Sequence, residues 1–106
     1  MEGQWRVVAV NGRPVAGSAT IAPPTFRISF GCNDGHGEVR LGPNLVTPSP
    51  LAVTERACLS ATDEPSDIMS IEQLGFQIAS RPMRIQWFEA ERARLSNAAG
   101  SIDLVR

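Results

Sequence analysis

The chain has 106 residues, and its ten arginines against eleven acidic residues give a formal net charge of −1 at pH 7. This length fits a single domain, which we place at residues 1–106. The balanced charge excludes the overall basic field with which a protein attracts nucleic acid or an anionic membrane surface. No apolar run is long enough to span a membrane, and the opening MEGQWRVVAV lacks the features of a signal peptide.

The first strand is expected at residues 4–10, where QWRVVAV is rich in aromatic and β-branched residues. It ends at Asn11-Gly12, a dipeptide that suits the positive φ angles of a tight turn. The later stretch AGSATIAPP has the composition of a loop, and its two prolines argue against a central strand. We therefore expect a loop over residues 16–24.

Alternating segments follow this loop. In TFRISF, three apolar residues alternate with Arg27 and Ser29, which predicts a strand with one apolar and one polar face. Gly31 is expected to end the strand, and NDGHG is expected to form a turn. EVRL alternates again, and LVTPSPLAVT is expected to hold two short strands interrupted by prolines, at a sheet edge or corner.

One helix is expected at residues 64–80. Apolar residues recur there at helical spacing, acidic residues stand near its start, and Pro82 stops it. Gly75 lies inside the helix and is interpreted as a point of close packing on the sheet. MRIQWF, ARLS and SIDLV then resemble the strands of an antiparallel meander, giving seven or eight short strands in all.

The stretch GCNDGHG, residues 31–37, contains the chain's only histidine and suggests two kinds of chemistry. A zinc site needs three or four ligands, usually Cys and His, and here Asp34 and Glu38 would have to complete the set, so we predict no metal site. Cys32 and His36 are the residue types of a nucleophile and its base, but no third group orients them. We predict no catalytic residue. We also predict no cofactor, because a chain without lysine lacks the usual phosphate loop.

Cys32 and Cys58 stand 26 residues apart, and each lies close to a strand-like segment. If those segments are neighbours, a disulfide closing this loop would contribute about 3.5 kcal/mol on the chain-entropy model. The alternative is a pair of reduced cysteines that pack as small hydrophobic residues. The residues alone leave both readings open.

Four features occur in a fixed order: a first strand with an early tryptophan, the turn NGRPV, the triplet GCN with glycines after it, and a T-x-x-x-C element. This order resembles the META domain (HslJ-like) family over nearly the whole chain. DGHG departs from the family pattern, which often has an aromatic residue soon after the asparagine, and RAC replaces an M-A-C-like end. The matching residues are Trp5, Asn11, Gly12, Pro14, Val15, Gly31, Cys32, Asn33, Gly37, Thr54 and Cys58.

The resemblance implies a compact antiparallel β-barrel-like sheet that carries one helix. Together with the segments above, it predicts a mainly β fold of seven to eight strands with the helix inserted before the last three. Members are commonly exported or lipid-anchored in the bacterial envelope, which favours an oxidised Cys32–Cys58 pair. We therefore expect a periplasmic protein or outer-membrane lipoprotein whose signal is absent from this chain, with a cytoplasmic location as the alternative.

The family has no established catalytic residues, and its described roles are envelope stress, motility or secretion, and tolerance of novobiocin. The resemblance thus implies a non-catalytic, stress-related envelope domain that acts as a disulfide-stabilised interaction scaffold. We expect a monomer with an unknown protein partner and no nucleic acid, peripheral to the membrane if its precursor is lipid-anchored. Arg27 and Ser29, on the polar face of their strand, are candidate contacts.

Two other functions stay open. A lipocalin-like binder of a small hydrophobic ligand would need a pocket of about 300 Å³ or more, lined by Trp5, Phe30 or Trp87. A thiol-dependent enzyme would use Cys32 and His36. Ligand-induced thermal shifts test the first alternative, and free-thiol titration tests the second.

Overall fold

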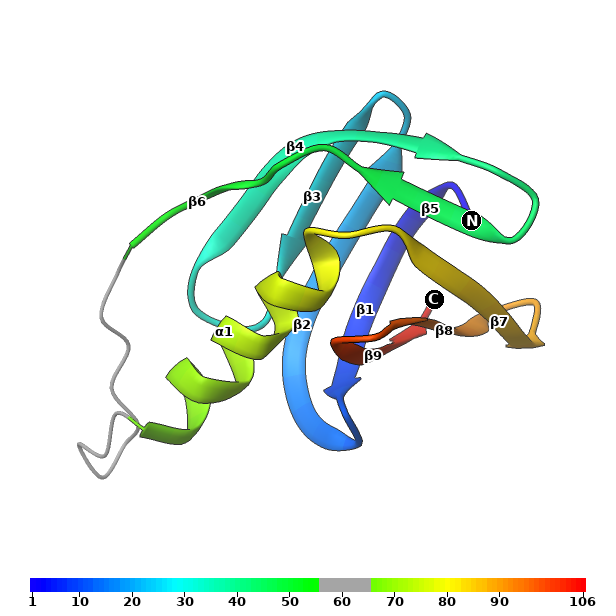
Figure 1. Ribbon diagram of the computed structural model, residues 1–106. Coiled ribbons are helices and arrows are strands. Elements are labelled where there is room, and N and C mark those ends of the chain that lie inside the picture. The colour runs from blue at the N-terminus through cyan, green and yellow to red at the C-terminus, as the bar shows by residue number, and fades with distance from the viewer. Residues whose placement is uncertain (56–65) are drawn as a thin grey trace.

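The computed structural model describes residues 1–55 and 66–106, and Figure 1 shows their arrangement. These two ranges contain nine strands and one helix. The elements are β1 (Gly3–Val10), β2 (Arg13–Ala22), β3 (Thr25–Ser29), β4 (Asp34–Leu41), β5 (Leu45–Pro48), β6 (Ala52–Val53), α1 (Ser66–Ala79), β7 (Met83–Glu89), β8 (Arg92–Asn97) and β9 (Gly100–Val105).

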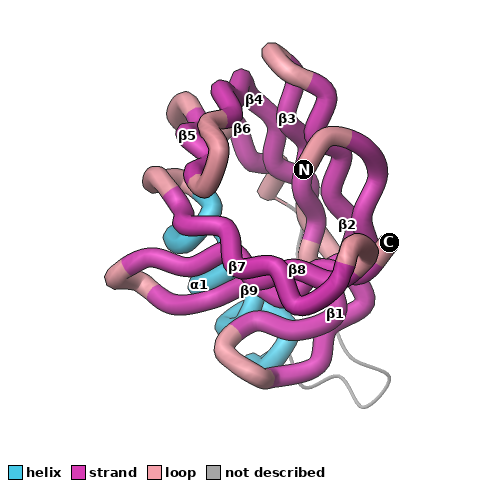
Figure 2. Tube along the Cα trace, turned by 90° about the vertical axis from the view of Figure 1, so that its right-hand side faces the viewer, coloured by secondary structure: helices cyan, strands magenta, loops and turns pink. Residues whose placement is uncertain are grey.

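Eight of the strands form a closed antiparallel barrel. Neighbours follow the order β3-β2-β1-β9-β8-β7-β5-β4, and β3 pairs with β4 to close the ring. The short β6 pairs with β4 outside this ring. Figure 2 shows the strands as a ring, with α1 lying across one end of it. The predicted mainly β barrel is confirmed, and its helix does precede the last three strands.

The interior of the barrel is filled by apolar side chains. The long strands turn alternate residues inward, as in β1, where Trp5 and Val7 are buried and Val10 follows after a shift of register. Wall strands on opposite sides of the ring contribute to one cluster, which α1 extends through Ile78 and Ala79. The largest fully buried side chains are Phe26, Ile21, Ile28, Ile78, Met83, Leu95, Ile102, Leu104, Val7, Val10 and Val46.

The loop expected at residues 16–24 is wrong. These residues belong largely to β2, which pairs with β1 on one side and β3 on the other. Small residues give β2 a weak strand signal, but Ala19 and Ile21 are buried, and pairing on both sides overrides weak local propensity. Pro23 and Pro24 lie in the turn after β2, where the N–H that proline lacks is not needed for a ladder hydrogen bond.

The turn expected at NDGHG is also misplaced. The chain turns at residues 30–33, and β4 already begins at Asp34, so His36 is a strand residue. The glycines signal close approach instead of a turn, because a Cβ at Gly35 would lie 2.7 Å from the Phe76 ring. A Cβ at Gly37 would lie 3.0 Å from the Ser49 hydroxyl, on the segment that crosses β4.

The helix and the interrupted strands agree with their predictions. The segment LVTPSPLAVT holds β5 and β6, both paired to β4, with the proline-containing stretch between them. Helix α1 spans Ser66–Ala79 within the expected range. Gly75 does mark close packing, because a Cβ there would lie 2.6 Å from the ring of Phe30, which in turn packs edge-on against Phe76.

Replacing Gly75 with alanine is therefore expected to destabilise the protein by about 2 kcal/mol, as overpacking a core does. Helix propensity alone predicts the opposite sign, a gain of about 1 kcal/mol. Urea unfolding of Gly75→Ala measures the difference, with Phe30→Leu and the double variant completing a cycle. A stabilised Gly75→Ala, or strictly additive effects with Phe30→Leu, would contradict the observed packing.

Candidate functional site

Two polar side chains are buried within the described part of the chain, Asn33 and Glu72, each 4% exposed. The Glu72 carboxylate of α1 accepts hydrogen bonds from the Asn33 backbone N–H and from Asn33 Nδ2, the latter at 2.9 Å. The Thr54 hydroxyl donates to Asn33 Oδ1 at 3.0 Å and accepts from the Asp34 N–H at 3.0 Å. We call Asn33, Thr54 and Glu72 the polar cluster.

The polar cluster joins three segments that are distant in sequence: the turn after β3, the residue after β6, and the middle of α1. No buried side-chain nitrogen or oxygen in the described residues lacks a hydrogen-bond partner. Both oxygens of Glu72 are occupied by Asn33, so they are engaged within the protein itself. The cluster therefore holds the helix and the turn in place on the barrel, which is a structural task.

The Asn11-Gly12 turn forms a second link between distant segments. Asn11 and Gly12 have φ angles of 50° and 77°, as a two-residue hairpin turn requires. The Asn11 N–H donates to the Ser101 carbonyl at 2.9 Å, and its side-chain oxygen accepts from the Ser101 N–H at 2.8 Å. The tight turn predicted at the end of the first strand is confirmed, and it also anchors β9.

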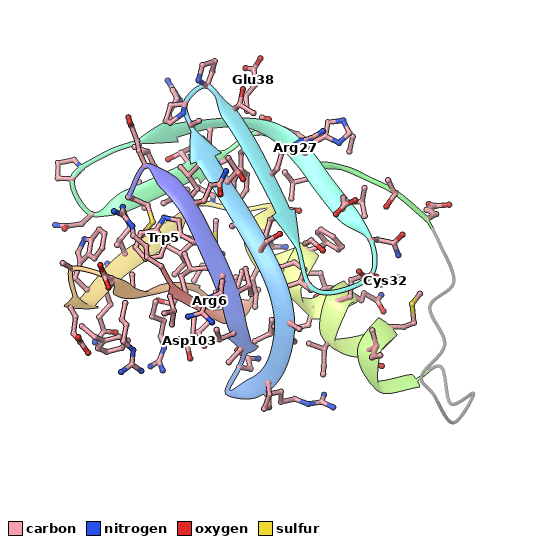
Figure 3. All side chains as sticks on the ribbon, turned by 180° about the vertical axis from the view of Figure 1, so that it is seen from behind. Trp5, Arg6, Arg27, Cys32, Glu38 and Asp103 are labelled. Atoms are coloured by element: carbon pink, nitrogen blue, oxygen red, sulfur yellow. The ribbon has the colours of Figure 1, made fainter. Side chains whose placement is uncertain are left out.

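Trp5 closes the barrel end near the chain termini (Figure 3). It is 2% exposed, and its indole N–H donates to the Met1 carbonyl at 2.9 Å. The Arg106 guanidinium lies 4.3 Å from the Trp5 ring centroid, and the Trp87 ring lies 5.8 Å away at a tilt of 52°. Trp5 thus fills this end of the barrel and ties down both termini.

The other residues of the GCNDGHG stretch lie in the turn between β3 and β4 or at the start of β4. Gly31 has a φ of 115°, which side-chain-bearing residues rarely adopt, in the turn between β3 and β4. Cys32 lies in the same turn, is buried, and is not a free cysteine. Cys58 lies outside the described residues, so its pairing with Cys32 stays a prediction. His36 is exposed on β4, opposite Arg27 of β3, whereas Cys32 is buried at the turn.

Arg27 and Ser29 lie on the outer wall formed by β2, β3 and β4, as their alternation predicts (Figure 3 labels Arg27). A polar hollow of about 220 Å³ lies there. The strand register places Thr20, Arg27 and His36 in one row across the three strands. The polar side chains that line the hollow are Ser18, Thr20, Arg27, Ser29, Asp34 and His36.

A family model for the META domain matches residues 1–100. The chain belongs to the META domain family. A comparison with curated proteins finds no match. A protein solved by NMR is similar in structure, with a TM-score of 0.77 and 17% sequence identity over 98% of this chain and 88% of that chain. At this identity the similarity establishes the fold alone.

Two features are absent from the described part of this META domain, a group of metal ligands and a membrane-spanning helix. No group of three His, Cys, Asp or Glu side chains within it is arranged to hold a metal ion. None of its described helices is long and apolar enough to cross a membrane. An apolar groove of about 280 Å³ does lie where β2 meets α1, and its lining includes Val15, Phe30 and Ile68.

Glu72 is the residue of this META domain that sequence reasoning missed. It occupies a position in α1 between Ile71 and Gly75, on a side of the helix that packs on the barrel. A lone acidic residue among inward-facing apolar positions is a signal for a buried polar partner, since charged residues are almost never buried unpaired. The asparagine of the GCN triplet was identified without that partner.

Proposed function

We propose that this META domain is a non-catalytic domain of the bacterial envelope that acts as a disulfide-stabilised interaction scaffold, with a role in stress. The observation that carries the proposal is the polar cluster. Asn33 and Thr54, which match the family pattern, direct their side chains to Glu72, to each other and to the backbone. Polar groups engaged in this way stabilise a fold and leave recognition to the outer surface.

The packing of the barrel supports the same proposal. The core cluster draws buried side chains from all eight wall strands and from α1. An eight-stranded barrel is just wide enough for its side chains to fill the interior. A filled barrel of this kind offers its outer wall, its rims and its exposed strand edges to ligands or partners.

Two observations support the disulfide. Cys32 is buried and is not free, and it directly precedes Asn33 in the turn. Thr54 is hydrogen-bonded to Asn33, and Cys58 follows Thr54 by only four residues, a stretch that reaches at most about 14 Å. The chain therefore departs toward Cys58 from a point beside Cys32. Oxidised pairs are typical of exported proteins, which favours the envelope over the cytoplasm.

The lipocalin-like alternative is kept because of the apolar groove that Phe30 lines. A ligand present at a hundredfold excess over its dissociation constant stabilises a protein by about 2.7 kcal/mol, which raises the melting temperature of so small a domain by about 10 °C. We expect no such rise when the domain is unfolded thermally with fatty acids or other small apolar compounds. A saturable rise that the groove variant Ile68→Lys removes would replace the scaffold with a ligand binder.

A further inference from the structure

One edge of β7 is paired over only part of its length. The neighbouring β5 pairs with β7 at two positions, Leu45 with Arg84 and Val46 with Met83. One further hydrogen bond runs from the Ile85 N–H to the Asn44 carbonyl, at 3.0 Å. The register with β5 ends there, although β7 continues to Glu89. In Figure 1, β7 and β5 diverge toward their hairpin ends.

The backbone of Trp87 faces the unpaired part of this edge. Successive residues of a strand point their N–H and C=O groups to opposite sides. The N–H and C=O of Trp87 therefore point to the same side as those of Ile85. On the opposite side, β7 is paired with β8 as far as Glu89, with a shift of register between Trp87 and Glu89. Among the described residues, none hydrogen-bonds Trp87 on the β5 side. The Trp87 N–H and C=O are therefore open to pairing with another strand.

Two large exposed side chains stand at the same edge. Trp87 is 41% exposed and Phe88 is 47% exposed. Trp87 turns toward the barrel end, where it packs on Trp5, while Phe88 lies under the Arg94 guanidinium, 5.2 Å from its ring centroid. Soluble proteins usually shield free edges with charge, proline or a covering segment. Here the register shift and Glu89 lie at the end of the edge, and Trp87 and Phe88 before Glu89 leave two aromatic rings exposed.

The adjoining cleft carries one uncompensated charge. A cleft of about 670 Å³ opens where β5 and β7 diverge, and Leu45, Arg84 and Ile85 contribute to its lining. The ion pairs found on this wall among the described residues are Arg94–Asp103 and Arg92–Glu89, and neither includes Arg84. A segment that lies along the edge would bring its outward side chains to the Arg84 guanidinium. A carboxylate is the side-chain group that pairs best with a guanidinium.

We propose that the β7 edge at residues 86–89 binds an extended segment of a partner protein by strand addition. The backbone of Trp87 pairs with the segment, apolar side chains of the segment contact Trp87, and a carboxylate on its outer face pairs with Arg84. This inference rests on the proposed scaffold function and names the class of partner. Backbone pairing supplies affinity in this mode of recognition, and side-chain contacts supply specificity.

The test uses the blocked peptide TEVTVTVET, whose symmetric sequence brings a glutamate toward Arg84 in either strand direction. We expect its addition to the whole domain to shift the amide NMR signals of residues 86–89 and to slow hydrogen exchange at the Trp87 N–H. Phe88→Lys places a charge on the edge and is expected to weaken binding about tenfold. Arg84→Glu is expected to weaken it about threefold to tenfold.

A charge-reversed peptide, TKVTVTVKT, separates pairing with Arg84 from general adhesion. It is expected to bind Arg84→Glu better than it binds the unchanged domain. Arg13→Glu, at the exposed start of β2, is the matched control and is expected to change neither affinity. The edge proposal would be overturned if Phe88→Lys bound TEVTVTVET as tightly as the unchanged domain does, or if the signal shifts were confined to the β2–β4 wall. Either result would leave the scaffold proposal standing. Concentration-dependent dimers that Phe88→Lys abolishes would assign the edge to a second copy and overturn it too.

Discussion

Replacing Glu72 with alanine is expected to lower the free energy of unfolding by about 3 kcal/mol. The substitution removes both acceptors of Asn33 and leaves its backbone N–H and amide group buried without the partners they have now. A buried polar group left unsatisfied costs about 1–3 kcal/mol, and more when the lost partner was charged. Urea-induced unfolding followed by tryptophan fluorescence measures the change.

Two variants on the same helix calibrate this result. Glu72→Gln keeps the shape and one oxygen acceptor, so its loss is expected to be smaller than that of Glu72→Ala. Gln73→Ala changes an exposed neighbour of similar helix propensity and is expected to stay within about 0.5 kcal/mol of the unchanged domain. If Glu72→Ala were as stable as Gln73→Ala, the polar cluster would not hold the fold together.

Reduction of the proposed Cys32–Cys58 disulfide is expected to remove about 3.5 kcal/mol of stability, the second large effect. A domain of this kind has about 5–15 kcal/mol in total, so the reduced protein would be marginal. Parallel urea titrations with and without reductant measure the difference. The double variant Cys32→Ala with Cys58→Ala is expected to be insensitive to reductant. Identical titrations for the unchanged domain with and without reductant would contradict the disulfide.

Sequence patterns predict the parts of this fold that depend on local order. Alternation identifies β3 and the later part of β4, and helical spacing with a terminal proline identifies α1. They fail at β2, where alanine, glycine and serine carry little strand signal and pairing with both β1 and β3 decides the structure. They fail again at Gly35 and Gly37, because a glycine needed for close approach looks the same as a glycine needed for a turn.

The candidate sites depend on contacts that cross the chain, which limits sequence reasoning further. Asn33 and Thr54 were identified by resemblance, but Glu72 lies 39 residues beyond Asn33 and becomes its partner only in the folded protein. The free edge of β7 has no sequence signature, since MRIQWF reads as an ordinary strand. Its exposure follows from where β5 stops, and only the arrangement in space shows that.

Free-thiol titration of the folded, unreduced protein isolated from its own cells would test most directly whether GCNDGHG has a structural role. We expect no reactive thiol before reduction and two thiols after unfolding in reductant, because the proposed disulfide engages both Cys32 and Cys58 and leaves no thiol nucleophile beside His36. A folded protein with a fast-reacting thiol at Cys32, whose loss of reactivity follows His36→Ala, would contradict that role and make the stretch a site of chemistry.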